Sequence, residues 1–216
     1  MKRFFHIILS FTIILFGCRC TSTETNRCLT EVDSLVRRNQ IDSAFRIINR
    51  VDVANLTSSA DSANFFLQKT RLLYKLYKPI KSTEMIDYSI RYYENQNDNI
   101  EKLTEAYFYK GVVLYEHKQI KDAIVYIKKA EYVARKLSTH PIKLQIYENL
   151  FVINEESGER QLALKYAKKV LDIANTLKDK VQLARAYNNI AVAYNKLHQT
   201  DSANVYITKS MKMLHY

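Results

Sequence analysis

The fold is decided by residues 107–137, YFYKGVVLYEHKQIKDAIVYIKKAEYVARKL. This pattern of residue types returns in residues 147–177, YENLFVINEESGERQLALKYAKKVLDIANTL, and again in residues 187–216, YNNIAVAYNKLHQTDSANVYITKSMKMLHY. Matching residues lie forty positions apart, as in Tyr107, Tyr147 and Tyr187, Tyr126, Tyr166 and Tyr206, and Ala123, Ala163 and Ala203. A fixed period of this length predicts a stack of similar units.

Each unit has the pattern of two helices joined by a short turn. In the first copy we expect helices over 104–116 and 121–137, because apolar residues recur there at helical spacing. One side of the second helix carries a stripe with spacings of four, three and four, formed by Ala123, Ile127, Ala130 and Ala134. Small residues let a neighbouring helix approach closely. We therefore expect Ala123 and its two repeats to occupy equivalent tight positions between helices.

This arrangement resembles the tetratricopeptide repeat (TPR). The family's slots are matched in order by Tyr107, Lys110-Gly111, Leu114, Ala123, Ile127 and Ala130, then by Tyr147, Asn149-Leu150-Phe151, Asn154, Ala163, Ala167 and Val170, and last by Tyr187, Ile190-Ala191, Tyr194, Ala203, Ile207 and Ser210. The usual TPR period is 34 residues, so each unit here is longer. The resemblance implies an all-α, right-handed superhelical solenoid of antiparallel helix pairs with a period of about 40 residues.

Two weaker copies precede the three clear ones. The second unit is matched by Phe66, Thr70, Leu73, Ser82, Ile86 and Ser89, and the first by Val32, Leu35, Ala44, Ile48 and Val51. The repeat domain is expected to cover 27–216, with units at about 27–58, 63–98, 104–137, 144–177 and 184–216. The alternative is an unrelated helical bundle, which need not keep a fixed period.

The N-terminus has the layout of a secretory signal. Lys2 and Arg3 precede an apolar run over 4–16, which is shorter than the roughly 20 residues that a membrane-spanning helix needs. The end of this run, Leu15-Phe16-Gly17-Cys18, resembles a bacterial lipoprotein box. The resemblance implies a signal peptide over 1–17, cleavage before Cys18 and acylation of that cysteine. The alternative is an uncleaved N-terminal anchor with an ordinary cysteine.

The rest of the leader and the overall charge give further expectations. Residues 21–26 are polar and small, so 18–26 is predicted to be a flexible tether. Cys20 and Cys28 could pair in an oxidising compartment, but two unpaired thiols are the preferred interpretation. The chain carries 33 Lys and Arg against 22 Asp and Glu. Export would make nucleic acid an unsuitable partner, so this surplus suits an anionic membrane or an acidic protein.

In a stack of helix pairs the first helices line the concave face, so their polar and aromatic residues are candidate ligand contacts. The predicted groove residues are Arg71, Tyr74, Phe108, Tyr115, Asn149, Arg185, Asn188, Asn189 and Asn195. The resemblance implies that Asn188 and Asn189 bond the backbone of a bound peptide, using amide donors and acceptor. The alternative is that these side chains are solvated. The basic pairs Lys128-Lys129 and Lys168-Lys169 are expected on the convex side, as a solubilising or membrane-facing surface.

No catalytic, metal-ligating or cofactor-binding pattern stands out. The three glycines, Gly17, Gly111 and Gly158, form no phosphate-binding loop, and no histidine has metal-ligand spacing. We therefore expect a non-enzymatic, exported, membrane-anchored adaptor that binds a protein or peptide, in the cell envelope and facing the periplasm. A second interpretation is a shortened relative of the sensor half of TPR-containing membrane regulators, and an enzyme is a third.

Apolar residues near the C-terminus, Met211, Met213 and Leu214, would leave an edge through which two copies could associate.

Overall fold

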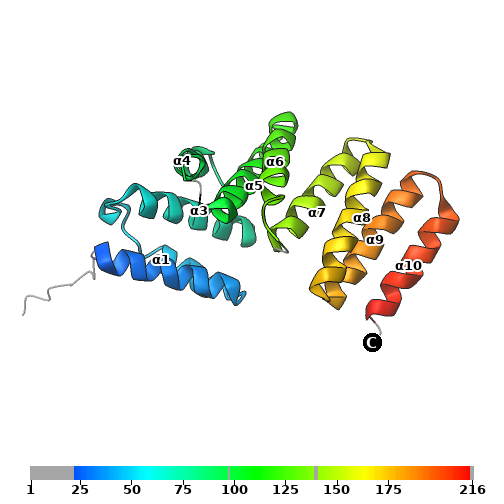
Figure 1. Ribbon diagram of the computed structural model, residues 1–216, viewed down its shortest axis with the longest axis horizontal. Helices are drawn as coiled ribbons and strands as arrows, with labels where there is room; N and C mark the ends of the chain where they lie inside the picture. The colour runs from blue at the N-terminus through cyan, green and yellow to red at the C-terminus, as the bar shows by residue number, and fades with distance from the viewer. Residues whose placement is uncertain (1–21, 97, 139–140, 215–216) are drawn as a thin grey trace, which may run out of the picture.

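The computed structural model describes residues 22–96, 98–138 and 141–214, and within them every regular element is a helix. The elements are α1 (Ser22–Arg37), α2 (Ile41–Ile48), the short 3-10 helix η1 (Val53–Asn55), α3 (Ser59–Lys75), α4 (Glu84–Glu94), α5 (Ile100–Glu116), α6 (Ile120–Ala134), α7 (Pro141–Glu156), α8 (Arg160–Leu177), α9 (Lys180–Lys196) and α10 (Thr200–Leu214). They follow one another along the long axis, from α1 at one end to α10 at the other (Figure 1).

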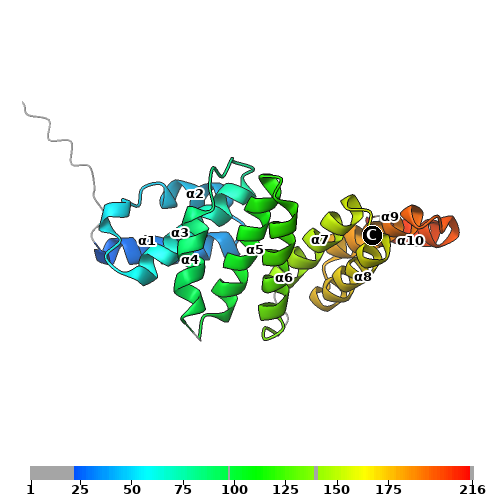
Figure 2. The ribbon, with the colours of Figure 1, turned by 90° about the horizontal axis from the view of Figure 1, so that it is seen from above.

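The helices form five consecutive pairs, α1 with α2 through α9 with α10, and each pair also packs on the next. Figure 2 shows the same elongated row from above. The predicted all-α solenoid of helix pairs is therefore confirmed. The first pair buries the apolar residues that matched the weakest copy of the pattern, which are Val32, Leu35, Ala44, Ile48 and Val51.

The small residues of the repeat occupy equivalent buried positions. Ala123, Ala163 and Ala203 are 0%, 1% and 3% exposed. Helix α5 crosses this stripe at Gly111, where an added Cβ would clash with Ile127 Cγ1 and lie 3.1 Å from the Ala123 carbonyl oxygen. In the second unit, by contrast, the predicted small residue Ser82 is exposed, because α4 begins only at Glu84.

The turn within each unit ends the first helix in the same way. One residue adopts the left-handed conformation, with φ of 52° to 78°, at Asn39, Tyr77, Lys118, Gly158 and His198. The next amide then donates back to a carbonyl in the last helical turn, as from Gln119 to Leu114 and from Gln199 to Tyr194, both at 2.9 Å. Glycine supplies this conformation most readily, yet Gly158 is the only glycine among these five positions.

The N-terminal boundary differs from the predicted one. Helix α1 begins at Ser22, so the last five residues of the predicted tether over 18–26 are helical. Thr25 in this segment is buried, and Cys28 is half-buried. The predicted signal peptide, Cys18 and Cys20 lie outside the described residues. Within the described ranges, no helix combines the length and the apolar character needed to cross a bilayer.

Tyrosines and lysines form a repeated cluster in each of the last three pairs, where the first helix packs against the second. A tyrosine from the first helix lies beside one from the second, with ring centroids 6.1–6.2 Å apart. A lysine ammonium lies 4.8–5.9 Å from both centroids. The second lysine of each predicted basic pair therefore has a structural role through cation–π contact. The three clusters are Tyr107, Tyr126 and Lys129, then Tyr147, Tyr166 and Lys169, and last Tyr187, Tyr206 and Lys209.

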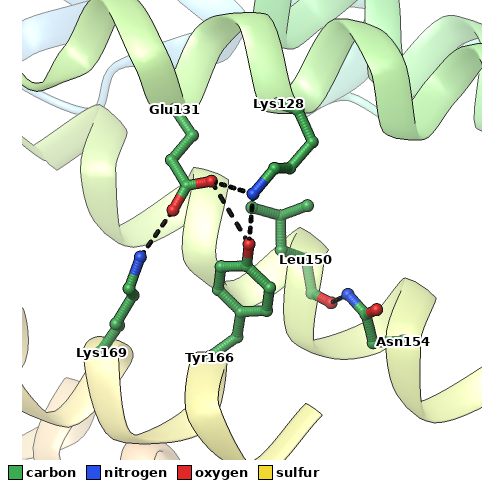
Figure 3. Close-up of polar contacts among 6 residues, drawn as sticks. All are labelled: Lys128, Glu131, Leu150, Asn154, Tyr166 and Lys169. Atoms are coloured by element: carbon green, nitrogen blue, oxygen red, sulfur yellow. Dashed lines mark hydrogen bonds and ion pairs between the residues drawn. The ribbon is translucent and has the colours of Figure 1, made fainter. Parts of the chain in front are cut away.

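A buried carboxylate joins the third unit to the fourth (Figure 3). Glu131 on α6 is 4% exposed and lies 2.5 Å from Lys128 Nζ and 2.6 Å from Lys169 Nζ. The Tyr166 hydroxyl accepts from Lys128 and donates to Glu131. Burial alone would raise the pKa of Glu131, but the two ammonium groups hold it below its usual value. The next repeat has Leu171 at the equivalent position, so the network is not part of the repeat pattern.

This network predicts a pH-dependent contribution to stability. At neutral pH we expect Glu131→Gln to lower the free energy of unfolding by about 1–2 kcal/mol, a value reduced because Lys128 and Lys169 are 49% and 34% exposed. Because the folded-state pKa is depressed, this contribution is complete above the unfolded glutamate pKa, about 4.3, and disappears as pH falls through the folded value. Urea unfolding of both proteins between pH 7 and the acid limit of folding measures the difference. A gap that stays constant or widens on acidification contradicts the assignment, and exposed Glu159→Gln is the control.

Candidate functional site

The first helices α3, α5, α7 and α9 are the ones expected to form the inner face of the solenoid, and aromatic side chains fill the space between them in its middle. Phe108 on α5, predicted as a groove residue, is 0% exposed. The Tyr74 ring packs edge-on against Phe108 and Tyr109, at centroid distances of 6.4 and 5.9 Å. Phe108 is therefore a core residue where the second and third units meet, and its side chain offers no exposed surface to a ligand.

Two further predicted groove residues hold neighbouring first helices together. The Asn149 amide on α7 partly offsets the rise in the Tyr74 pKa that burial causes, and it donates to the Gln145 carbonyl at 2.9 Å. The Tyr115 hydroxyl donates to Glu156, so α5 is tied to α7 near their C-terminal ends. Burial and the Glu156 carboxylate raise the pKa of Tyr115 to about 12. Asn149 and Tyr115 thus serve contacts between repeats.

Ion pairs also bridge the first helices. Arg71 on α3 lies 3.3 Å from Glu105 on α5, and Arg185 on α9 lies 3.5 Å from Glu148 on α7. The charges on these helices are therefore arranged as neighbouring opposite pairs. Burial raises the pKa of Glu148, and Arg185 partly offsets that effect. The two arginines differ in exposure, since Arg71 is mostly buried while Arg185 is exposed.

The three predicted asparagines of α9 remain available. Asn188 and Asn195 are exposed, Asn189 is half-buried, and none of the three forms a side-chain hydrogen bond within the described part of the chain. Asn188 and Asn195 continue the helix face of Arg185 at helical spacing. Val152 on α7 is exposed as well. Helices α7 and α9 therefore present an open surface with free amides and apolar contact area.

Two cavities lie on this side of the molecule. The first has a volume of about 650 Å³ and is lined by α1, α3, α5 and the start of α7. Four carboxylates and four cations lie in its wall, namely Asp33, Asp98, Glu101 and Glu105, and Arg37, Arg71, Lys75 and Lys102. The second, of about 450 Å³, lies between α7 and α9, with Glu148, Gln182 and Arg185 in its wall. Pro141 and Gln145 line both, so the cavities adjoin each other.

Buried polar atoms without a hydrogen-bond partner concentrate in these cavities. In the first cavity they are Gln68 Oε1 and Arg71 Nε, and in the second they are Glu148 Oε1 and Gln182 Oε1. Glu148 Oε1 has only its 3.5 Å ion pair with Arg185. Buried donors and acceptors in proteins are nearly always satisfied. The four atoms lie beneath the cavity surface, on residues that line it, so this part of the wall is polar but incompletely hydrogen-bonded.

The predicted groove residues include neither Gln68 nor Gln182. Gln68 and Gln182 each precede a predicted arginine, Arg71 or Arg185, by three positions on the same helix face. On α3 and on α9, extending the row of predicted groove residues by one helical turn towards the N-terminus would have included both glutamines. Among the residues that the structure describes, no group of histidine, cysteine and carboxylate side chains is arranged to hold a metal ion.

Comparisons with known proteins support the fold. No protein-family model and no curated protein matches the chain. BtubC (BKLC) from P. vanneervenii is 13% identical, with a TM-score of 0.70 over 90% of this chain and 81% of that one. A kinesin light chain from Podosopora anserina with nearly identical TPR-like repeats is 13% identical, with a TM-score of 0.66 over 89% and 96%.

Aspartyl phosphate phosphatase F from Bacillus subtilis is also similar in structure. It is 19% identical, with a TM-score of 0.68 over 87% of this chain but 48% of its own. Identities this low establish the architecture alone. The chain has the TPR-like solenoid fold that its forty-residue period predicts.

Proposed function

We propose that the protein is a non-enzymatic adaptor that binds a segment of a partner protein, or a peptide, along its inner face. The binding surface extends from the cavity beside α3 to the open face of α7 and α9. The observation that carries this proposal is the open face of α9, where the Asn188, Asn189 and Asn195 amides form no side-chain hydrogen bond within the described residues, next to two adjoining cavities. A main chain offers alternating donors and acceptors, which suits such a surface. The free amides of Asn188 and Asn189 extend it.

A comparison of bait proteins tests this proposal. We expect the double variant Asn188→Ala with Asn189→Ala to recover the principal partner at least tenfold less well than the parent chain, because truncating both amides removes hydrogen bonds at the open face. The matched control is Gln161→Ala with Lys165→Ala, two exposed residues of α8. Quantitative mass spectrometry after purification from cells gives the ratio. Equal recovery by both double variants would place the binding surface elsewhere.

The proposal also includes export and a lipid anchor. Its support is the sequence Leu15-Phe16-Gly17-Cys18 after a basic start and a short apolar run. Acylation of Cys18 would hold the repeat domain at a bacterial membrane, facing the periplasm, since several acyl chains anchor far better than one. After cleavage the chain would lose Lys2 and Arg3, and its remaining positive charge would favour contact with anionic lipid or an acidic partner over nucleic acid.

The lipid anchor makes a direct prediction. An alkyne analogue of palmitate should label the parent chain in cells, and the labelled protein should sediment with membranes. Cys18→Ser should lose the label, because the acceptor thiol is absent. An unlabelled parent chain that stays membrane-bound, with Cys18→Ser behaving identically, would instead support the uncleaved anchor.

The exposed edge of α10 favours a second candidate function. Val205, Ile207, Met211 and Leu214 are all exposed there, whereas Ile127, equivalent to Ile207, is fully buried. An apolar edge of this kind suits a contact with a second copy or with another module, as in a sensor or regulatory unit related to TPR-containing transcriptional regulators or histidine kinases. Sedimentation velocity over a range of concentrations tests self-association. A single monomeric species throughout would exclude the contact between copies.

A further inference from the structure

The outward side of α6 carries a row of exposed residues in which cations alternate with a valine and a tyrosine. This outer row consists of Lys121, Val125, Lys128 and Tyr132, at spacings of four, three and four, which place all four on one side of the helix. Val125 is 51% exposed and Tyr132 is 65% exposed. The buried stripe that begins at Ala123 lies on the opposite side of α6, so the outer row faces away from the neighbouring helices.

The other second helices do not repeat this composition. The equivalent positions are Gln161, Lys165, Lys168 and Asp172 on α8, and Asp201, Val205, Thr208 and Lys212 on α10, and all eight are exposed. Among these three helices, only α6 combines two cations with two large side chains and no carboxylate in the row. Because the same fold accepts other residues at these positions, packing of the repeats does not explain the α6 outer row.

Positive charge is concentrated on the second helices of the last three units. Helices α6, α8 and α10 carry nine Lys and Arg against four Asp and Glu, whereas the first helices α5, α7 and α9 carry six of each. Arg135, directly after α6, adds a guanidinium group 5.4 Å from the centroid of the Tyr132 ring. The second helices therefore attract an anionic surface more strongly than the first helices do.

Carboxylates on α6 do not cancel this charge. Asp122 is the one exposed carboxylate of the helix. Lys128 pairs with Glu131, but that buried carboxylate is shared with Lys169, so the group of three keeps one positive charge. The outer row, with Arg135 after it, therefore stays basic.

The apolar part of the row adjoins a cavity of about 570 Å³. Five of the seven residues that line it are aliphatic or aromatic, and the other two are Lys128 and Lys129. An acidic surface alone would pair with the lysines and gain nothing from the exposed Val125 and Tyr132. A bilayer surface uses both, because lysines approach lipid phosphates while aliphatic and aromatic side chains enter the boundary between headgroups and acyl chains.

We propose that the outer row of α6 is a docking surface for an anionic phospholipid bilayer. The ammonium groups of Lys121 and Lys128 lie at the lipid phosphates, and Val125 and Tyr132 enter the headgroup boundary. This inference rests on the proposed lipid anchor, which would hold the repeat domain at a high local concentration beside the membrane. The asparagine amides of α9 are not part of this contact, so they stay available to a partner protein.

Fluorescence quenching in vesicles tests the inference, because the chain contains no tryptophan and a single introduced one reports on its own surroundings. Full-length Tyr132→Trp is compared with Lys212→Trp, which places the same probe at the equivalent exposed position of α10. Both are reconstituted into brominated vesicles of phosphatidylcholine, with or without phosphatidylglycerol. With phosphatidylglycerol present, we expect quenching of Tyr132→Trp to be at least threefold stronger than quenching of Lys212→Trp.

Further substitutions test the named contacts. Adding Lys121→Gln and Val125→Ser to Tyr132→Trp should remove its stronger quenching, because one phosphate contact and one apolar contact are lost. Adding Val205→Ser, the matched change on α10, should leave it unchanged. Circular dichroism verifies that all variants are folded. Quenching that is equally strong without phosphatidylglycerol contradicts the anionic preference.

The remaining outcomes separate this surface from the lipid anchor and from a protein partner. Equal quenching of the two probes overturns the docking surface, and if a protein also crosslinks from positions 125 and 132 in cells, the row belongs to an acidic partner instead. Palmitate-analogue labelling is read on the same proteins. A labelled chain with equal quenching refutes only the docking surface, and an unlabelled chain with strong quenching at position 132 refutes only the anchor. An unlabelled chain with equal quenching refutes both.

Discussion

Phe108→Ala is expected to lower the free energy of unfolding by about 3–5 kcal/mol, the range for truncating a fully buried phenylalanine. Phe108 is 0% exposed and contacts the rings of Tyr74 and Tyr109, so its removal opens a cavity where the second and third units meet. Urea unfolding followed by circular dichroism measures the loss. Asn188→Ala is the control, because exposed substitutions usually change stability by less than about 0.5 kcal/mol.

The same pair of variants separates a core residue from a ligand contact. Phe108, Glu148 and Asn188 lie forty residues apart at equivalent positions of three first helices. The repeat pattern alone would therefore assign them the same role. In the structure Phe108 is buried, while Asn188 is exposed. If Phe108→Ala unfolds like the parent chain but loses partner binding, Phe108 lies on the groove surface and the closed middle of the inner face is wrong.

Ala123→Leu is expected to lower the free energy of unfolding by about 1–3 kcal/mol, because added methylene groups must displace well-packed neighbours. Ala123 is 0% exposed, and its carbonyl lies beside Gly111 of the facing helix. Ala163→Leu should behave similarly, since Ala163 is 1% exposed at the equivalent place. Thermal and urea unfolding of both variants provide the measurement.

The control for these two variants is Ala60→Leu, in the exposed first turn of α3. It makes the same chemical change at an exposed side chain, so it should alter stability by less than about 0.5 kcal/mol. If all three variants unfold like the parent chain, the small residues do not set the distance between helices. The repeat register would then have to be reassigned.

The repeat architecture was predictable because its signals are local and periodic. A small residue at 123, 163 and 203 must be buried wherever two helices of a pair cross closely, and the forty-residue interval carries that requirement from unit to unit. Ser82 matches a small-residue position of the repeat but is not buried. The cause is local, since the second helix of that unit begins after it, at Glu84. The helical state of 22–26 was missed because its polar, small residues are also typical of a linker.

The candidate site was less predictable because it depends on how successive units are rotated. The pattern of one unit does not predict that Tyr74 packs against Phe108 and Tyr109 of the next unit and so closes the middle of the inner face. The same rotation brings Arg71 to Glu105 beside the first cavity. Further along the row, at α9, no described side chain hydrogen-bonds the three asparagine side chains, and Asn188 and Asn195 stay exposed.

A photo-crosslinking scan in living cells tests most directly whether the inner face binds the partner. A photoreactive amino acid is placed in turn at 185, 188, 192 and 195 on α9, and at the outer positions 161 and 165 on α8 and 125 and 132 on α6. We predict that one partner crosslinks from the α9 positions, which follow helical spacing along the inner face, and from none of the outer positions. Crosslinks confined to α6 and α8 would contradict the account.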